Sequence, residues 1–96
     1  MDGLTITNID HGDRGEYRAH VDGSDHIGRL TWVKKGDVRV AEHTLVPKQI
    51  GGRGIAYELV KIMIEDARAK GFRIDPHCPY VAMRFDKHPE WSGLRA

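Results

Sequence analysis

The fold is decided by one stretch of the sequence, Pro47-Lys48-Gln49-Ile50-Gly51-Gly52-Arg53-Gly54-Ile55-Ala56, in which three glycines lead directly into an apolar repeat. The first N–H groups of a helix have no partner within the helix and carry partial positive charge, so they bind phosphate where no Cβ blocks the approach. Lys48 and Arg53 add positive charge on either side of the turn. The stretch therefore suits a ligand with several phosphates, although glycines that only permit a tight strand-to-helix turn explain it equally well.

The residues that follow this turn are apolar at spacings of three and four, which is the repeat of an amphipathic helix. They are Ile55, Ala56, Leu59, Val60, Met63, Ile64 and Ala67. We predict a helix from Arg53 to Lys70 that ends at Gly71, because glycine readily takes the left-handed conformation of a helix end. The basic residues Arg68 and Lys70 suit the negative end of the helix dipole.

The residues before the turn alternate between apolar and polar side chains and are rich in β-branched and aromatic residues, which is typical of strands. Four strands are predicted: Leu4 to Ile9, Glu16 to Asp22, His26 to Lys34 and Asp37 to Val46. Their short connections require antiparallel neighbours. On the second strand, Tyr17, Ala19 and Val21 share one face. On the third, Leu30 and Trp32 do the same, so this face is expected to form the core.

The residues after the helix predict a fifth strand and a second, shorter helix. The strand spans Phe72 to His77, and Pro76 places it at an edge of the sheet or gives it an irregular end, because proline has no N–H to donate. Pro79 suits the first turn of a helix, which His88-Pro89 then ends. Together these elements predict an α+β fold with one sheet, one long helix and one short C-terminal helix.

Length and composition restrict the classes of protein to which the chain can belong. Its 96 residues and even composition predict a single domain, residues 1–96. Fifteen basic and fourteen acidic residues give a net charge of +1, far from the excess expected of a nucleic-acid-binding domain. Cys78 is the only cysteine, which excludes an internal disulfide and fits a reducing compartment. No apolar run reaches the length of a membrane span and the start of the chain does not look like a secretory signal, so a cytoplasmic location is expected.

Three segments are informative because of their order along the chain. They are Glu42-His43-Thr44-Leu45-Val46-Pro47, then Gly51-Gly52-Arg53-Gly54-Ile55-Ala56, then His77-Cys78-Pro79-Tyr80-Val81 followed by His88-Pro89-Glu90-Trp91. This order resembles the GNAT acetyltransferase superfamily, and specifically its smallest branch of single-domain proteins. The last segment is the most specific of the three. The resemblance covers most of the chain and implies a GNAT-like mixed, mostly antiparallel sheet.

The resemblance also implies that acetyl-CoA is the cofactor, with its pyrophosphate on backbone N–H groups of the turn and its pantetheine between splayed fourth and fifth strands. The residues implied in binding it are Val46, Gly51, Gly52, Arg53, Gly54, Ile55, Ala56 and Tyr80. Gly54 and Ala56 match the superfamily pattern, but Gln or Arg is usual where this chain has Gly51. We expect Arg53 or Lys48 to replace the missing side chain.

Acetyl transfer from a thioester to an amine requires a base for the amine, a donor for the carbonyl and a proton for the leaving thiolate. The candidate catalytic residues are Cys78, His43 and Glu42. Cys78 at a helix start either carries the acetyl group as a thiolate or is a small buried hydrophobe. Glu42 and His43 are expected on opposite faces of a strand, so at most one of them faces the acetyl group as a base. The histidines and the cysteine do not show the paired spacing of metal ligands, so no metal site is expected.

We therefore expect an acetyl-CoA-dependent N-acetyltransferase that acts on an unidentified amine, whether a small amine, a polyamine or a protein lysine. One alternative is a non-catalytic module that binds or senses acetyl-CoA. Another is an interaction domain whose exposed strand edge pairs with a partner. Neither nucleic acid nor a membrane is expected as a partner, and the chain is expected to be a monomer or a weak dimer.

Overall fold

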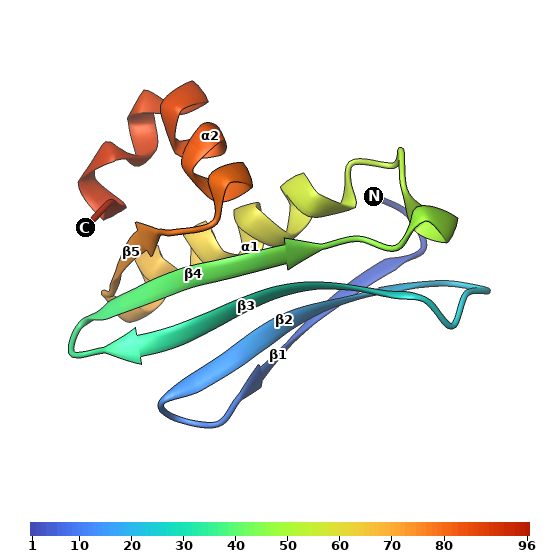
Figure 1. Cartoon of the computed structure of the whole chain (residues 1–96), viewed down its shortest axis with the longest axis horizontal. Helices are drawn as coiled ribbons and strands as arrows, with labels where there is room; N and C mark the ends of the chain where they lie inside the picture. The colour runs from blue at the N-terminus through green and yellow to red at the C-terminus, as the bar shows by residue number, and fades with distance from the viewer.

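One sheet of five strands runs through the computed structural model, which describes residues 1–96 (Figure 1). The strands are β1 (Leu4–Asp10), β2 (Arg14–Val21), β3 (Ile27–Lys35), β4 (Val38–Leu45) and β5 (Arg73–Pro76). The helices are α1 (Ile55–Lys70) and α2 (Pro79–Lys87), with the short 3-10 helices η1 (Lys48–Ile50) and η2 (Pro89–Leu94). The strand order is β1-β2-β3-β4-β5; the first four strands are antiparallel neighbours, and β5 is parallel to β4. The predicted α+β fold with a mixed, mostly antiparallel sheet is confirmed.

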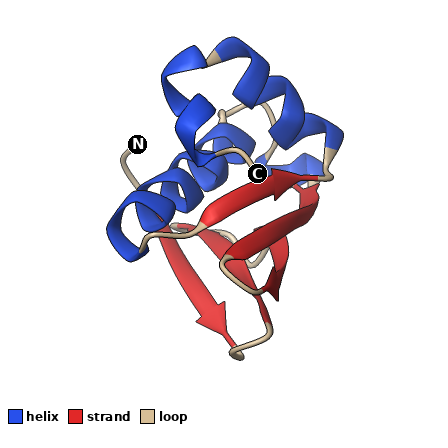
Figure 2. Cartoon of the chain, turned by 90° about the vertical axis from the view of Figure 1, so that its left-hand side faces the viewer, coloured by secondary structure: helices blue, strands red, loops and turns tan.

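The predicted core face of the sheet is also confirmed. Tyr17 and Ala19 on β2, and Leu30 and Trp32 on β3, are all 0% exposed. These four side chains belong to one hydrophobic core that also contains the inner side of α1. The helices lie on this side of the sheet, and Figure 2 shows that no helix covers the opposite face. The predicted strand ends differ from the observed ones by at most two residues.

The long helix α1 begins two residues later than predicted. Gly54 takes the left-handed conformation with a φ of 79° and is the N-cap of the helix, so Arg53 lies outside it. The other end is as predicted: α1 ends at Lys70, and Gly71 with a φ of 78° donates its N–H to the carbonyl of Ala67 at 2.9 Å. The left-handed glycine at each end therefore sets the length of the helix.

The strand β5 lies at an edge of the sheet, as Pro76 predicts, but it is shorter than expected. Residues 72 and 77 do not pair with β4. The end of the chain returns to β5, where Arg95 forms an isolated parallel bridge with Ile74 and the N–H of Ala96 donates to the Ile74 carbonyl at 2.8 Å. This tail, including the 3-10 helix η2, could not be read from the sequence. No helix of the structure has both the length and the apolar character that a membrane crossing requires.

Candidate active site

The turn between β4 and α1 leaves the first N–H groups of the helix without side-chain partners. Gly52 and Gly54 have φ values of 74° and 79°, in the left-handed region that favours glycine. Because the N-cap Gly54 has no side chain, no side-chain hydrogen bond caps α1. A Cβ built on either glycine would meet no atom within 4 Å, so the space around the turn is open. The glycines are needed for the conformation of the turn, and the same turn presents free donors to an anion.

The cationic side chains of the turn are available to a ligand. Lys48 and Arg53 are exposed, and neither forms an ion pair. Ile55 differs from them, since its side chain is 2% exposed and belongs to the core, so only its backbone can contact a ligand. Gly51 is extended, and a Cβ there would approach the carbonyl oxygen of Lys48 at 3.3 Å. The tight approach at Gly51 is a local reason for glycine where the superfamily usually has Gln or Arg.

The strands β4 and β5 separate where Pro76 interrupts the pairing. Their register ends with Ala41 opposite Pro76, and one further backbone bond follows, from the Cys78 N–H to the Ala41 carbonyl at 2.9 Å. The helix α2 begins immediately afterwards, at Pro79. Beyond Ala41, β4 continues to Leu45 with a neighbouring strand on its β3 side only. The last part of β4 therefore has an unpaired edge between the glycine turn and the start of α2.

A β-bulge at Glu42 breaks the alternation of side chains along β4. Thr31 of β3 pairs with His43 and Trp32 pairs with Ala41, so Glu42 has no residue opposite it on β3. A bulge inserts one extra residue and redirects the side chains next to it. The expectation that Glu42 and His43 point to opposite faces rested on strict alternation, which the bulge removes.

Glu42 and His43 line one hollow of about 340 Å³ together with His77. Its other lining residues are Val33, Lys35 and Val40. Val33 of β3 pairs with Val40 of β4. Val33 follows the core residue Trp32 and Val40 precedes the core residue Ala41, so both valines, and the hollow with them, lie on the face of the sheet away from α1. His77 is exposed and its Nε2 lies 3.2 Å from the Asp75 carboxylate. The structure therefore brings a carboxylate and two imidazoles together beside the end of β5.

Cys78 lies on the helix side of the sheet, away from this hollow. It is 5% exposed, belongs to the core and is the N-cap of α2. Its Sγ lies 3.4 Å from the Thr44 hydroxyl, a contact that sequence reasoning missed although Thr44 follows the candidate His43 directly. Burial alone raises the pKa of the Cys78 thiol, but hydrogen bonds from Thr44 and from the N–H groups of Val81 and Tyr80 outweigh it, and the pKa lies below its ordinary value.

Tyr80 is held in place by its own helix and by α1. Its hydroxyl accepts a hydrogen bond from Arg84 Nε at 3.1 Å. The Arg84 guanidinium also lies over the Tyr57 ring, 4.2 Å from its centroid. Tyr80 is half-buried and packs against the core, so it combines a packing role with a position on the first turn of α2, next to Cys78.

The His-Pro-Glu-Trp segment of the tail is a clamp between the tail and α1. The ring of His88 stacks on Trp91 with centroids 3.9 Å apart and on Tyr57 of α1 with centroids 5.6 Å apart. Its Nε2 contacts the Tyr57 hydroxyl at 3.2 Å, and its Nδ1 contacts the Glu90 carboxylate at 3.0 Å. The hydrogen bond to His88 is the main cause that lowers the pKa of Glu90. His88 is thus engaged on both ring nitrogens, and no group of three or more potential metal ligands comes together in the structure.

Comparison with known proteins assigns the class of protein that this fold and turn define, an acyl-CoA-dependent acyltransferase. The family model described as GCN5-related N-acetyl-transferase matches residues 16–94, which is most of the chain. The chain belongs to this family, and the resemblance drawn from the sequence is confirmed. No curated protein matches the chain. Family membership establishes acyl-CoA-dependent N-acyl transfer as the class of activity, with an acyl-CoA and an acceptor as the molecules bound.

Proposed function

We propose that the protein transfers an acetyl group from acetyl-CoA to the amino group of a small amine, a polyamine or a protein lysine. One observation carries the proposal. The unpaired edge of β4 begins where Pro76 ends the pairing with β5 and α2 starts after Cys78, and β4 then leads to the turn with the free N–H groups at the start of α1. A ligand with phosphates at one end and a reactive thioester at the other fits this succession of groups.

In this arrangement the turn binds the pyrophosphate of acetyl-CoA. Backbone N–H groups from Gly52 to Ala56 supply the donors, and Lys48 and Arg53 supply charge that no acidic side chain neutralises. The edge of β4 up to Val46 offers backbone groups to the amide bonds of the pantetheine arm, as the edge of a sheet does for an added strand. Tyr80 at the start of α2 closes the other side of this path.

The chemistry requires groups on both sides of the thioester. The amine attacks the carbonyl carbon, a C–N bond forms, the C–S bond breaks, and the amine proton passes to a base while the CoA thiolate takes up a proton. The hollow with Glu42, His43 and His77 supplies the base on the outer face of the sheet. Cys78 lies on the inner face and its thiol donates the proton to the leaving thiolate. In this scheme the sheet separates the acceptor from CoA, and the two meet where β4 and β5 part.

The low pKa of Cys78 favours a second route, in which its thiolate attacks the thioester first and the acetyl group then passes to the amine. Intact-mass spectrometry after mixing with acetyl-CoA separates the two routes. Direct transfer predicts no acetyl adduct on Cys78 and measurable turnover in Cys78→Ser. An acetyl adduct that disappears on addition of amine, together with loss of turnover in Cys78→Ser, would establish the covalent route instead.

The proposed activity is tested by release of CoA from acetyl-CoA in the presence of a panel of amines and basic peptides. We expect release that depends on an amine, and tight binding of acetyl-CoA in calorimetry. Binding without release from any amine would mean that the protein is a sensing module rather than an enzyme. Glu42→Gln, His43→Gln and His77→Gln then identify the base, since the variant that removes it should lower kcat by roughly a hundredfold.

A further inference from the structure

The two edges of the sheet are treated differently by the rest of the chain. The β5 edge is covered, because Arg95 bridges to Ile74 and the Ala96 N–H donates to the Ile74 carbonyl. The β1 edge has only β2 as a neighbour, and no segment of the chain pairs with its other side. One edge of the sheet therefore remains open to another strand.

The open edge presents a regular set of backbone groups. The N–H of Asp22 donates to the Gly3 carbonyl, and the N–H of His11 donates to the Arg14 carbonyl, so the odd-numbered residues of β1 are those bonded to β2. The even-numbered residues Leu4, Ile6 and Asn8 consequently direct their N–H and C=O groups away from β2. Three alternate residues thus each offer a donor and an acceptor in the spacing that an antiparallel or parallel strand requires.

The amino-acid composition of β1 does not prevent another strand from pairing with its open edge. Its sequence, Leu-Thr-Ile-Thr-Asn-Ile-Asp, contains four β-branched residues and no lysine, proline or glycine. Proteins usually protect an open edge with lysine, with proline, with a bulge or with a covering segment. The register of β1 with β2 is continuous over all seven residues, so no bulge turns the edge aside.

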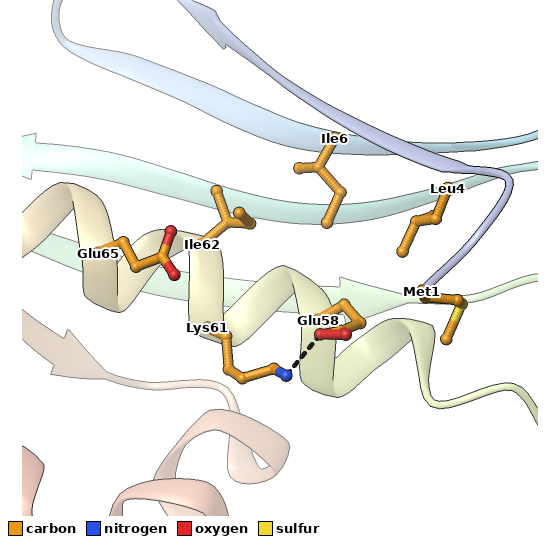
Figure 3. Close-up of a pocket in the computed structure, with 7 residues that line it drawn as sticks. All are labelled: Met1, Leu4, Ile6, Glu58, Lys61, Ile62 and Glu65. Atoms are coloured by element: carbon orange, nitrogen blue, oxygen red, sulfur yellow. Dashed lines mark ion pairs between the residues drawn. The ribbon is translucent and has the colours of Figure 1, made fainter.

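A hollow of about 250 Å³ lies beside this edge, between β1 and α1 (Figure 3). Leu4 and Ile6 line it from the strand and Ile62 lines it from the helix. Met1, which is 56% exposed, forms part of the same wall. Because Leu4 and Ile6 also carry the free backbone groups, a strand added to β1 would place every second side chain over this apolar hollow.

The charge of the hollow indicates which side chains the added strand carries. The helix contributes Glu58, Lys61 and Glu65 to its rim. Lys61 Nζ lies 2.7 Å from the Glu58 carboxylate, as the dashed line in Figure 3 marks, so this pair is neutral as a whole. Glu65 is exposed and forms no ion pair, so its carboxylate is the one charged side chain of the rim without a partner. A second copy of β1 brings no basic residue to meet it, since Asp10 is the only charged residue of that strand.

We infer that the open edge of β1 binds an extended peptide segment that continues the sheet and turns an apolar and a basic side chain, two residues apart, toward the hollow between β1 and α1. Backbone hydrogen bonds to Leu4, Ile6 and Asn8 hold the segment, an apolar side chain packs between Ile6 and Ile62, and a basic side chain pairs with Glu65. This site lies at the opposite edge of the sheet from β5 and is independent of acetyl transfer. It gives the exposed strand edge a partner of defined chemistry.

The test uses a fluorescently labelled peptide with the seven-residue length of β1, in which valine, lysine and valine occupy every second position and threonine fills the others, so that the valines and the lysine face α1 together. Fluorescence anisotropy should show saturable binding to the intact protein, and NMR should show slowed amide exchange at Leu4, Ile6 and Asn8. The same peptide with N-methyl groups on alternate residues should not bind, because it keeps its side chains but loses its donors. The same peptide with glutamate in place of lysine should bind at least tenfold more weakly.

Substitutions at exposed positions complete the test. Glu65→Lys should weaken binding of the valine–lysine peptide about tenfold, since it replaces an attraction by a repulsion. Asp25→Lys is the matched control: it makes the same change of net charge in an exposed turn and should leave binding unchanged. Equal binding of the N-methylated peptide, or equal effects of the two lysine variants, would overturn the inference. A concentration-dependent dimer in sedimentation that Ile6→Lys abolishes would also overturn it, in favour of a second copy at this edge.

Discussion

A left-handed glycine sets each end of α1, but the C-terminal end packs against the core and the N-terminal end is exposed. At the C-terminal end Gly71 is followed by Phe72, which is 7% exposed, and the guanidinium of Arg39 lies between Trp32 and Phe72, 4.3 and 4.1 Å from the ring centroids. At the N-terminal end, residues 51–54 are exposed and no side chain caps the helix. A left-handed glycine can therefore end a helix where the chain turns into the core, or end it where the terminal N–H groups of the helix stay free for a ligand.

The largest expected effect concerns the packed end. Trp32→Ala removes a fully buried ring that packs against Arg39, so we expect the free energy of unfolding to fall by about 3–5 kcal/mol. Chemical denaturation monitored by circular dichroism measures this loss. A loss below about 1 kcal/mol would show that the packing at this end contributes little to the free energy of unfolding, and would contradict the distinction between a packed and an open end of α1.

The sharpest comparison uses the same substitution at both ends. Gly54→Ala and Gly71→Ala each place alanine at a φ near +79° with no atom within 4 Å of the new Cβ. Both should lower the free energy of unfolding by about 1–2 kcal/mol, the usual cost of this conformation for a residue with a side chain. Only Gly54→Ala should also weaken the binding of acetyl-CoA in calorimetry, because only that end of α1 is proposed to bind the cofactor. Equal affinities of the two variants for acetyl-CoA would contradict the assignment of the turn.

A smaller effect is expected from a hydrogen bond near the packed end. The Tyr17 hydroxyl donates to the Asp66 carboxylate at 2.8 Å, so Tyr17→Phe should lower the free energy of unfolding by about 1 kcal/mol at neutral pH. Burial first, and then the hydrogen bond to Asp66, raise the pKa of Tyr17 above its ordinary value of 10.0. The folded state therefore favours the neutral phenol, and this stabilisation is present below pH 10 and declines above it. Unfolding curves at rising pH should show that decline in the wild type, and the Phe variant should lack this contribution.

The smallest effect on stability is expected at Arg53. Its side chain is exposed and forms no ion pair, so Arg53→Ala should change the free energy of unfolding by less than about 0.5 kcal/mol. Its affinity for acetyl-CoA should nevertheless fall about threefold to tenfold, because a cation beside the pyrophosphate is lost. Lys87→Ala, on the last turn of α2, is the control. Unchanged affinity in Arg53→Ala would show that Arg53 does not replace the side chain absent at Gly51.

Patterns that depend on neighbouring residues were read correctly from the sequence. The alternation of Tyr17 and Ala19 fixed a core face, and the repeat from Ile55 to Ala67 fixed the inner side of α1, because strands and helices impose these periods on the residues that they bury. The start of α1 was predicted two residues early. Gly54 is compatible with both a helix and its cap, and its φ depends on the path of the chain in three dimensions.

The parts that escaped prediction depend on contacts between distant segments. The bulge at Glu42 arises from the register of β3 with β4, and a single extra residue leaves no mark in the alternation of so short a strand. The contact of Thr44 with Cys78 joins residues from β4 and α2 across the point where the strands part. The role of His88 as a clamp depends on Tyr57, a residue of α1 that the motif itself does not include. Periodicity carries no information about such pairs.

The parallel pairing of β5 with β4 has a consequence for the order in which the protein becomes functional. The strands β1 to β4 are joined by short turns and contact their neighbours in the sequence, so they can assemble as the chain leaves the ribosome. The strand β5 can join β4 only after α1 has been made, and Cys78 follows β5. The turn that we propose binds phosphate is thus present in the chain well before Cys78, at the other end of the proposed site. A nascent chain therefore presents an incomplete site until its last quarter has been synthesised.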